Sequence, residues 1–338
     1  MVMRVILTGG LGFIGSHFVK HFLKSTSDKD LKLYNIDYAG YGSNPLNIEN
    51  EVKEDPRYEF IKKDINHIFA ITDIEGADII VNIAAESHVD RSIIDPRTFI
   101  SSNIQGTFSL LEYARKKDVK KFIQVSTDEV YGDAPAEKSF KESDPINPSN
   151  PYSATKAAAD VLVKSYHRTY GINAVISRCT NNYGPNQFPE KFIPRTIIRI
   201  LKGKPVILYG NGKAVRDWIH VSDHITALLS IMNKGLAGEV YNISSDNPTS
   251  NAKVSNYIAK FLKPRDSKKI EVNYVNDRPG HDLRYSIQST KIREELGWSP
   301  KIRFEEGLDE TIRWYVQHVD WWAPLTETAI LHPPTWEF

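Results

Sequence analysis

Along the chain, short apolar runs rich in β-branched residues alternate with longer segments in which apolar positions recur every three or four residues. The short runs are typical of buried strands, and the longer pattern is typical of amphipathic helices. Because helical segments separate successive strands, the pattern predicts an α/β fold with a doubly wound parallel sheet of the Rossmann type. The predicted strands cover residues 3–7, 31–36, 58–61, 78–83, 121–125 and 174–177.

Three helices are expected between these strands. The first follows a glycine-rich turn and ends near Lys24. The second covers residues 95–117, with Pro96 in its first turn, where the missing N–H has no intrahelical partner to lose. The third covers residues 150–170 and is rich in alanine near its start.

From Arg178 onward the chain is more polar and richer in turns, which indicates a second, smaller α/β domain. We expect a strand at 204–209 that ends in a hairpin turn at 210–212, and a helix with Ser222 as its N-cap. Other expected elements are a helix ending near residue 201, a strand at 240–243, helices at 247–261 and 307–322, and a tail at 322–338 packed across the surface. The expected domains are interleaved, with residues 1–178 and 214–245 in one and residues 179–213 and 246–338 in the other.

The composition is that of an ordinary globular protein, with 338 residues, 41% hydrophobic and 25% charged. The net charge of +1 gives no indication of a nucleic-acid or membrane-surface partner. Cys179 is the only cysteine, so no intrachain disulfide can form, and we expect a structural thiol in a reducing cytoplasm. No signal peptide or membrane-spanning run is expected.

The first predicted strand leads into a turn in which Gly9, Gly12 and Gly15 follow a G-x-x-G-x-x-G pattern. Such glycines let backbone N–H groups approach a pyrophosphate at the positive end of a helix. The second strand ends in Asp37, about 20 residues further on, the spacing of a carboxylate that binds adenosine ribose hydroxyls. A carboxylate there would repel a 2′-phosphate, so we expect NAD rather than NADP. The alternative is a glycine turn with a solvated aspartate.

The ends of the next two strands are expected to line the same crevice. Asp64 either contacts the adenine or only caps the turn that follows it. Ala84 and Ala85 would let the backbone approach the cofactor closely. Ser87 and His88 are placed to line the crevice, although a loop histidine is more often simply solvated.

The candidate catalytic groups follow the fifth strand and begin the helix at 150–170. Asp128 and Glu129 could form an acid/base pair, because repulsion between neighbouring carboxyls keeps one of them protonated. Tyr152 and Lys156 lie four residues apart on one helix face, so we expect the lysine to lower the pKa of the phenol and make it a usable base. A solvated turn is the alternative for the carboxyl pair, and it is disfavoured by Thr127 before the pair and by the Tyr-Lys motif after it.

These segments resemble the extended short-chain dehydrogenase/reductase family, and within it the sugar-nucleotide 4,6-dehydratases, from Met3 to about Tyr315. The start TGGLGFIGS and the Tyr-x-x-x-Lys pair indicate the broad family. The segments AAESHVDRS, STDEVYGD, NNYGPNQFPEKFIP, YGNGKAVRDWIHVSDH and DRPGHDLRY are far more specific. The resemblance implies NAD-dependent conversion of dTDP-glucose to a 4-keto-6-deoxy sugar nucleotide, without a metal. It also implies a homodimer formed through the helices at 95–117 and 150–170.

The resemblance implies three sets of site residues. The catalytic set is Thr127, Asp128, Glu129, Tyr152 and Lys156. The cofactor set is Gly9, Gly12, Phe13, Ile14, Gly15, Asp37, Tyr38, Ala39, Gly40, Asp64, Ile65, Ala84, Ala85, Glu86, Ser87, Ser102, Tyr152, Lys156 and Asn182. The substrate set is His88, Thr127, Asn181, Lys191, Phe192, Ile207, Leu208, Tyr209, Arg216, Asn251, Asp277, Arg278, Pro279, Gly280 and His281.

Two positions depart from the family pattern, since Ser102 replaces a frequent threonine and Leu283 a frequent basic residue. Three alternative functions stay open: a dehydratase of a UDP- or GDP-sugar, a 4-epimerase, and a non-catalytic NAD-binding scaffold. A 4-epimerase is not expected to carry the carboxyl pair, and a scaffold needs none of the catalytic set. For Arg216 and Arg278, surface ion pairs are the alternative to phosphate contacts.

Overall fold

The computed structural model describes all residues except 1–2, 73, 75, 264–269, 330 and 332–338. Its centre is a seven-stranded sheet in the order β10-β6-β5-β4-β1-β2-β3, and every pair of neighbours is parallel. The strand bounds are β1 Arg4–Thr8, β2 Lys32–Asp37, β3 Tyr58–Lys62, β4 Ile79–Asn82, β5 Lys121–Thr127, β6 Ala174–Cys179 and β10 Val240–Ile243. The predicted Rossmann-type sheet is therefore confirmed.

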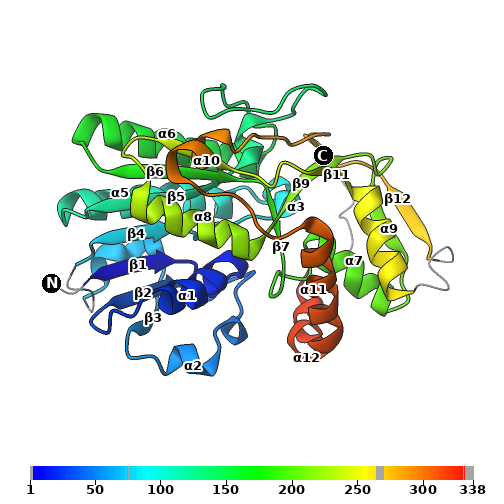
Figure 1. Ribbon diagram of the computed structural model, residues 1–338, viewed down its shortest axis with the longest axis horizontal. Helices are drawn as coiled ribbons and strands as arrows, with labels where there is room; N and C mark the ends of the chain where they lie inside the picture. Colours follow the sequence, from blue (N-terminus) through cyan, green and yellow to red (C-terminus); the bar gives the residue numbers. More distant parts are fainter. Residues whose placement is uncertain (1–2, 73, 75, 264–269, 330, 332–338) are drawn as a thin grey trace.

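Helices cover both faces of this sheet (Figure 1). Successive residues of β1 face opposite sides, so Val5 and Leu7 pack into one core layer and Ile6 into the other. The first layer lies under α1 (Phe13–Ser25) and α8 (Val221–Lys234), and the second under α5 (Gly106–Lys116) and α6 (Pro151–Tyr170). The sheet is buried on both sides, which explains why its strands read as continuous apolar runs.

One of the expected helices forms with clear caps at both ends, and another is interrupted. Asn150 and Ser153 form a capping box at the start of α6, and Gly171 ends that helix in a left-handed conformation. The segment expected to be one helix at 95–117 is interrupted by a π-helical stretch, Ile100–Gln105, between α4 (Arg97–Phe99) and α5. Such stretches are frequent beside functional sites, and this one carries Ser102.

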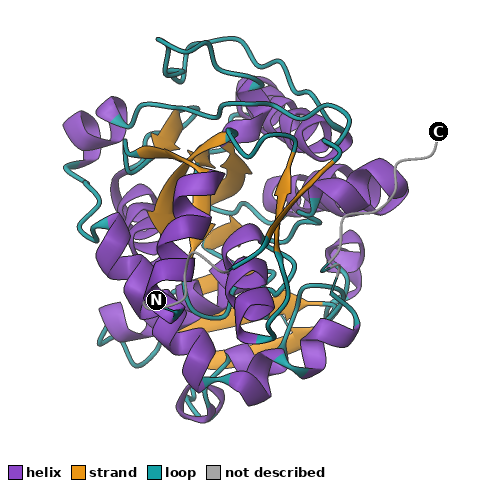
Figure 2. Ribbon diagram, turned by 90° about the vertical axis from the view of Figure 1, so that its right-hand side faces the viewer, coloured by secondary structure: helices purple, strands orange, loops and turns teal. Residues whose placement is uncertain are grey.

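The smaller part of the molecule has its own core and two small sheets, seen at the right of Figure 1. The strands of this part are β7 Asn181–Tyr183, β9 Val215–His220 and β11 Pro248–Ser250 in one sheet, and β8 Val206–Tyr209 and β12 Val272–Val275 in the other. Its helices are α7 Phe192–Leu201, α9 Asn251–Leu262, α11 Phe304–Gln317 and α12 Val319–Trp322. Further short helices of the chain are α2 Asn50–Lys53, α3 Val89–Ile94 and α10 Thr290–Leu296. Figure 2 shows, from the side, how helices pack around the strands of the whole molecule.

Several local predictions for this part were wrong. Residues 210–212 do turn the chain, with positive φ at Gly210 and Gly212, but β8 pairs with β12 and β9 pairs with β7 and β11, so no hairpin forms. Ser222 is not an N-cap, because α8 begins at Val221 and Ser222 donates its N–H to the His220 ring.

Two helix bounds also differ from expectation. The helix expected from residue 247 begins at 251, because 248–250 form β11 and Ser250 caps the helix that follows. The helix expected at 307–322 is divided at His318 into α11 and α12. Much of the tail, for which surface packing is expected, lies outside the described residues.

Candidate active site

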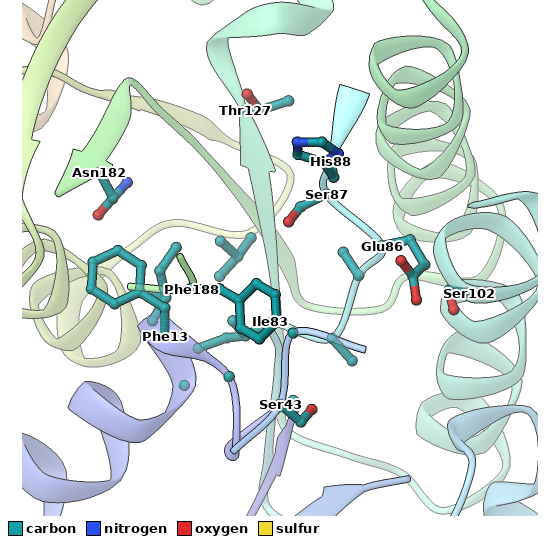
Figure 3. Close-up of a pocket in the computed structure, with 18 of the residues that line it drawn as sticks. Phe13, Ser43, Ile83, Glu86, Ser87, His88, Ser102, Thr127, Asn182 and Phe188 are labelled. Carbon is teal, nitrogen blue, oxygen red and sulfur yellow. The ribbon is translucent and has the colours of Figure 1, made fainter. Parts of the chain in front are cut away.

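A cavity of about 280 Å³ opens at the carboxyl ends of the parallel strands, where the strand order reverses between β1 and β4 (Figure 3). Ligands bind at this switch point in open α/β sheets. The cavity brings together the whole catalytic set and most of the cofactor set. The predicted residues that line it are Gly9, Gly12, Phe13, Ile14, Gly15, Asp37, Tyr38, Asp64, Ile65, Ala84, Ala85, Glu86, Ser87, His88, Ser102, Thr127, Asp128, Glu129, Tyr152, Lys156, Asn181, Asn182 and Lys191.

The glycine-rich turn is built for close backbone approach. A Cβ on Gly15 would lie 2.1 Å from the Gly9 carbonyl oxygen, so only glycine lets α1 pack on the turn. Gly12 is the N-cap of α1 and has no side-chain cap, and a Cβ there would meet only the Gly9 oxygen within 4 Å. An uncapped helix start that faces an open cavity fits a pyrophosphate.

Asp37 lies at the end of β2 and its carboxylate is held by three donors. These are the N–H groups of Leu11 and Ala39 and the hydroxyl of Ser43, at 2.8–3.1 Å. Burial raises the pKa of Asp37, and the three hydrogen bonds oppose that shift. A carboxylate fixed in this way at the cavity wall fits the ribose end of NAD. Ala39 and Gly40 follow it but do not line the cavity.

Asp64 caps the turn that follows it, and its contact with the adenine stays a prediction. Its carboxylate accepts the N–H of Asn66 at 2.8 Å and caps the following turn. With Ile65 it also lines the cavity.

The carboxyl pair begins a single helical turn directly after β5. Thr127 accepts the N–H of Glu129 and donates its hydroxyl to Asp128, at 3.3 and 3.2 Å. Burial raises the pKa of Asp128 well above its usual range, and the nearby Glu129 charge raises it further. The other oxygen of Asp128 is buried and has no hydrogen-bond partner within the described part of the chain. The expectation that one carboxyl of the pair is kept protonated is therefore supported for Asp128.

Tyr152 and Lys156 line the cavity from the first turns of α6. Lys156 Nζ donates to the Val125 carbonyl at 2.6 Å, and burial lowers the pKa of this lysine. Burial raises the pKa of Tyr152 well above its usual range, and the Glu129 charge adds to the shift. The net shift of the Tyr152 pKa is therefore upward, opposite to the expected lowering, because desolvation of the phenol is its largest cause.

Cys179 also lines the cavity, in contact with the Ser126 carbonyl. Burial raises the pKa of its thiol to about 12, which keeps it protonated and unreactive near neutral pH. The expectation of a structural thiol agrees with this environment.

Most of the predicted substrate set lies beyond the cavity wall. Phe192 stacks on Trp218 at 5.9 Å between ring centroids, and Arg216 donates to backbone carbonyls and to the His281 ring. The Arg216 guanidinium also lies 4.1 Å from the centroid of the Tyr285 ring. The predicted residues that do not line the cavity are Ala39, Gly40, Phe192, Ile207, Leu208, Tyr209, Arg216, Asn251, Asp277, Arg278, Pro279, Gly280 and His281.

The cavity includes an aromatic and charged group that we did not predict. The Arg91 guanidinium lies 3.7 Å from the centroid of the Tyr41 ring and pairs with Glu86 at 2.7 Å. Tyr41 also contacts Phe188, at 5.1 Å between centroids, and donates its hydroxyl to Glu190. Arg91 and Glu190 lie inside segments that are specific to the family, which could have marked them as candidate site residues. Their spacing along the chain did not show that both would lie beside Tyr41.

Tyr285 is a second residue that sequence reasoning missed. Its hydroxyl lies 3.1 Å from a carboxylate oxygen of Glu129 and 2.8 Å from one of Asp282. The remaining cavity residues outside the predicted set are Ile36, Gly42, Ser43, Lys63, Ile83, Val125, Ser126, Thr180 and Gln187. Of these, Ser43 and Ile83 are drawn in Figure 3.

Comparison with known proteins gives a consistent result. The family model for GDP-mannose 4,6 dehydratase matches residues 6–311. The chain belongs to this family. A curated member, dTDP-glucose 4,6-dehydratase of Escherichia coli, is 42% identical over 95% of this chain and 95% of its own length. Among the described residues, no helix is both long and apolar enough to cross a membrane.

Solved structures of related enzymes share the fold. The dTDP-glucose 4,6-dehydratase DesIV of Streptomyces venezuelae, solved with NAD and TYD bound, has a TM-score of 0.91 and 42% identity over 96% of this chain and 100% of its own. UDP-glucose 4-epimerase of Thermus thermophilus, solved with NAD, has a TM-score of 0.83 and 29% identity over 94% of this chain and 100% of its own. The family's dehydratases are thus more similar to this chain than this epimerase is.

Proposed function

We propose that this chain converts dTDP-glucose to dTDP-4-keto-6-deoxyglucose, as an NAD-dependent hydro-lyase. The observation that carries the proposal is the buried Asp128 next to Glu129, in one cavity with Tyr152, where burial raises the pKa of Asp128. An epimerase has no use for a separate proton donor and acceptor of this kind. The dehydratases named above, at 42% identity, support the same function.

The cofactor would lie along the cavity from Asp37 to Tyr152. Gly9, Gly12 and the start of α1 would hold its pyrophosphate, and Asp37 would bind the adenosine ribose. NAD held there would supply hydride transfer from sugar C4 and back to C6, while a proton returns to C5. The cofactor is then regenerated in each turnover, so we expect it to stay bound during purification.

Oxidation at C4 would use Tyr152, Thr127 and Lys156. Tyr152 would take the proton of the C4 hydroxyl, and Thr127 would hydrogen-bond the same oxygen. Because Tyr152 has a raised pKa in this structure, forming its phenolate is energetically unfavourable. The nearby Lys156 cation would favour the phenolate at that step.

Elimination would use the carboxyl pair. The C4 ketone acidifies the C5 hydrogen, which Glu129 as carboxylate would remove. Hydroxide is a poor leaving group, so Asp128 would protonate the C6 oxygen as water departs. The buried position of Asp128 keeps this proton available near neutral pH.

The nucleotide would be held by the smaller part of the chain. We assign His88 and Asn181 to the sugar or its phosphates, and two guanidinium groups, Arg216 and Arg278, to the diphosphate. The other proposed contacts are Lys191, Phe192, Ile207, Leu208, Tyr209, Asn251, Asp277, Pro279, Gly280 and His281. This assignment follows the interleaved domains proposed from the sequence. The membership of β10 in the large sheet supports that division, but β9 lies in a small sheet although residues 214–245 were expected in the large domain.

We also propose a homodimer formed through α5 and α6. Phe108 on α5 and Val161 and Tyr170 on α6 are 47–54% exposed, so apolar side chains are available for contact on both helices. Light scattering at micromolar concentration should give the mass of a dimer, and a monomer would contradict it. We place the enzyme in the cytoplasm, in keeping with its single, buried cysteine.

The deciding experiment is incubation of purified protein with dTDP-glucose, without added NAD, followed by mass spectrometry. Loss of one water from the substrate supports the dehydratase and shows that the cofactor co-purifies. A product of unchanged mass but altered configuration would instead indicate a 4-epimerase. Parallel reactions with UDP- and GDP-glucose test the base specificity.

A further inference from the structure

Asp90 is a buried carboxylate to which nothing above gives a role. It lies in α3, in the part of the chain that forms the seven-stranded sheet, and its side chain is 3% exposed. Burying a charged carboxylate is unfavourable unless hydrogen bonds or an opposite charge compensate it. The partners of Asp90 should therefore show what it is for.

Both partners come from the smaller part of the molecule. The Tyr209 hydroxyl donates to Asp90 Oδ2 at 2.5 Å, and Arg278 Nη1 lies 3.4 Å from Oδ1. Tyr209 ends β8, and Arg278 follows β12, the strand that pairs with β8. The Asp90 carboxylate therefore contacts residues at the carboxyl ends of both β8 and β12.

Arg278 keeps hydrogen-bond donors for another partner. A guanidinium carries five N–H donors in a rigid fork, and Asp90 engages one edge of it. The Nε of Arg278 is buried and has no hydrogen-bond partner within the described residues. The Arg195 guanidinium lies 5.8 Å from the Tyr209 ring, so a second cation is close by. Two cations and a fixed aromatic ring suit a nucleoside diphosphate.

We propose that Asp90 is a positioning residue for the nucleoside diphosphate of the substrate. It orients the Tyr209 ring and the Arg278 guanidinium from across the junction between the two parts of the chain. The proposal rests on the proposed function, since that function places the nucleotide at these two residues. Asp90 itself need not touch the ligand.

The test compares Asp90→Asn with wild type. The variant keeps the shape and an acceptor for Tyr209, but it loses the charge that holds Arg278. We expect the Kd for dTDP, measured by calorimetry, and the KM for dTDP-glucose both to rise about tenfold, the scale of one charge-assisted hydrogen bond. The kcat, the NAD content and the melting temperature should change little. A merely structural role would lower all three together.

Asp95→Asn is the matched control. Asp95 directly follows the same short helix, is 46% exposed and pairs with Arg97, two residues away. This variant should leave the Kd for dTDP unchanged. Equal effects of the two substitutions would overturn the proposal.

Tyr209→Phe tests the same contact from the other side and keeps the proposal falsifiable if Asp90→Asn does not fold. It should also raise the Kd for dTDP, and in the double variant the two effects should be less than multiplicative. Unchanged dTDP binding in Tyr209→Phe would contradict the proposal.

Measuring UDP and GDP as well separates this proposal from the proposed function. A wild type that binds a nucleoside diphosphate but does not dehydrate dTDP-glucose would contradict the function. The effect of Asp90→Asn on that ligand would still decide the role of Asp90.

Discussion

The cofactor half and the nucleotide half of the site are built differently. In the cofactor half, residues at strand ends such as Gly9, Asp37 and Ala84 line one cavity, as the strand-end rule predicts. In the proposed nucleotide half, most of the predicted residues lie beyond that cavity, and some are held by one another, as Arg216 is by His281. The first half depends on local strand-turn-helix units, and the second on contacts between distant segments. Substitutions in the two halves should therefore change different properties of the protein.

The largest effect is expected for Glu129→Gln, at the meeting point of the two halves. Removing the base should lower kcat by about 10²- to 10⁴-fold, the usual contribution of a general acid or base. NAD content and dTDP binding should remain, because neither uses this carboxylate as base. Product analysis and calorimetry would check both points, and normal water loss would contradict the assigned role.

In the cofactor half, two glycine substitutions should distinguish an effect on packing from an effect on cofactor binding. Gly15→Ala places a Cβ 2.1 Å from the Gly9 oxygen, so we expect both a lower melting temperature and lost NAD. Gly12→Ala adds a Cβ whose single neighbour within 4 Å is 3.3 Å away, so the fold should persist while NAD content falls. Thermal unfolding and NAD content after denaturation measure the two effects. Equal melting temperatures for the two variants would contradict this distinction.

Tyr285→Phe should lower kcat less than Glu129→Gln does. The hydroxyl of Tyr285 lies between Glu129 and Asp282 and can donate to one of them at a time, so its loss leaves a buried carboxylate short of a donor. Such a loss costs about 1–3 kcal/mol, so we expect kcat to fall about tenfold. The KM should change less, because Tyr285 approaches the base rather than the nucleotide. A rise in KM with unchanged kcat would place Tyr285 in the nucleotide half instead.

The smallest effect is expected for the pH dependence of stability, which Asp128→Asn should change. Because burial raises the pKa of Asp128 in the folded state, folding binds a proton, and stability falls as pH rises from the unfolded pKa toward the folded one. Asp128→Asn removes this dependence, so its melting temperature should exceed that of wild type more at pH 8 than at pH 5. Thermal unfolding at both values measures the difference. A constant difference would contradict a raised pKa of Asp128 in the folded state. Activity should be lost at every pH, since an amide cannot protonate the leaving oxygen.

The sheet was predictable, and candidate catalytic residues could be named, because each rests on a short stretch of chain. Short apolar runs, a glycine turn and a Tyr-Lys spacing need only a few neighbouring residues to be recognised. The hairpin expected at 210–212 was wrong because strand pairing is decided by distant partners, here β12 for β8 and β11 for β9. The N-cap expected at Ser222 was wrong for a similar reason, since the His220 ring takes that place.

The amino-acid order alone was sufficient for the fold class and the preference for NAD, and it named the candidate acid/base residues that the cavity brings together. These follow from side-chain chemistry and from spacing along single elements. The tertiary structure decided that burial raises the pKa values of Asp128 and Tyr152, and that Asp90 meets Tyr209 and Arg278. Desolvation and contacts across more than a hundred residues arise only when the chain is packed, so no local pattern can encode them.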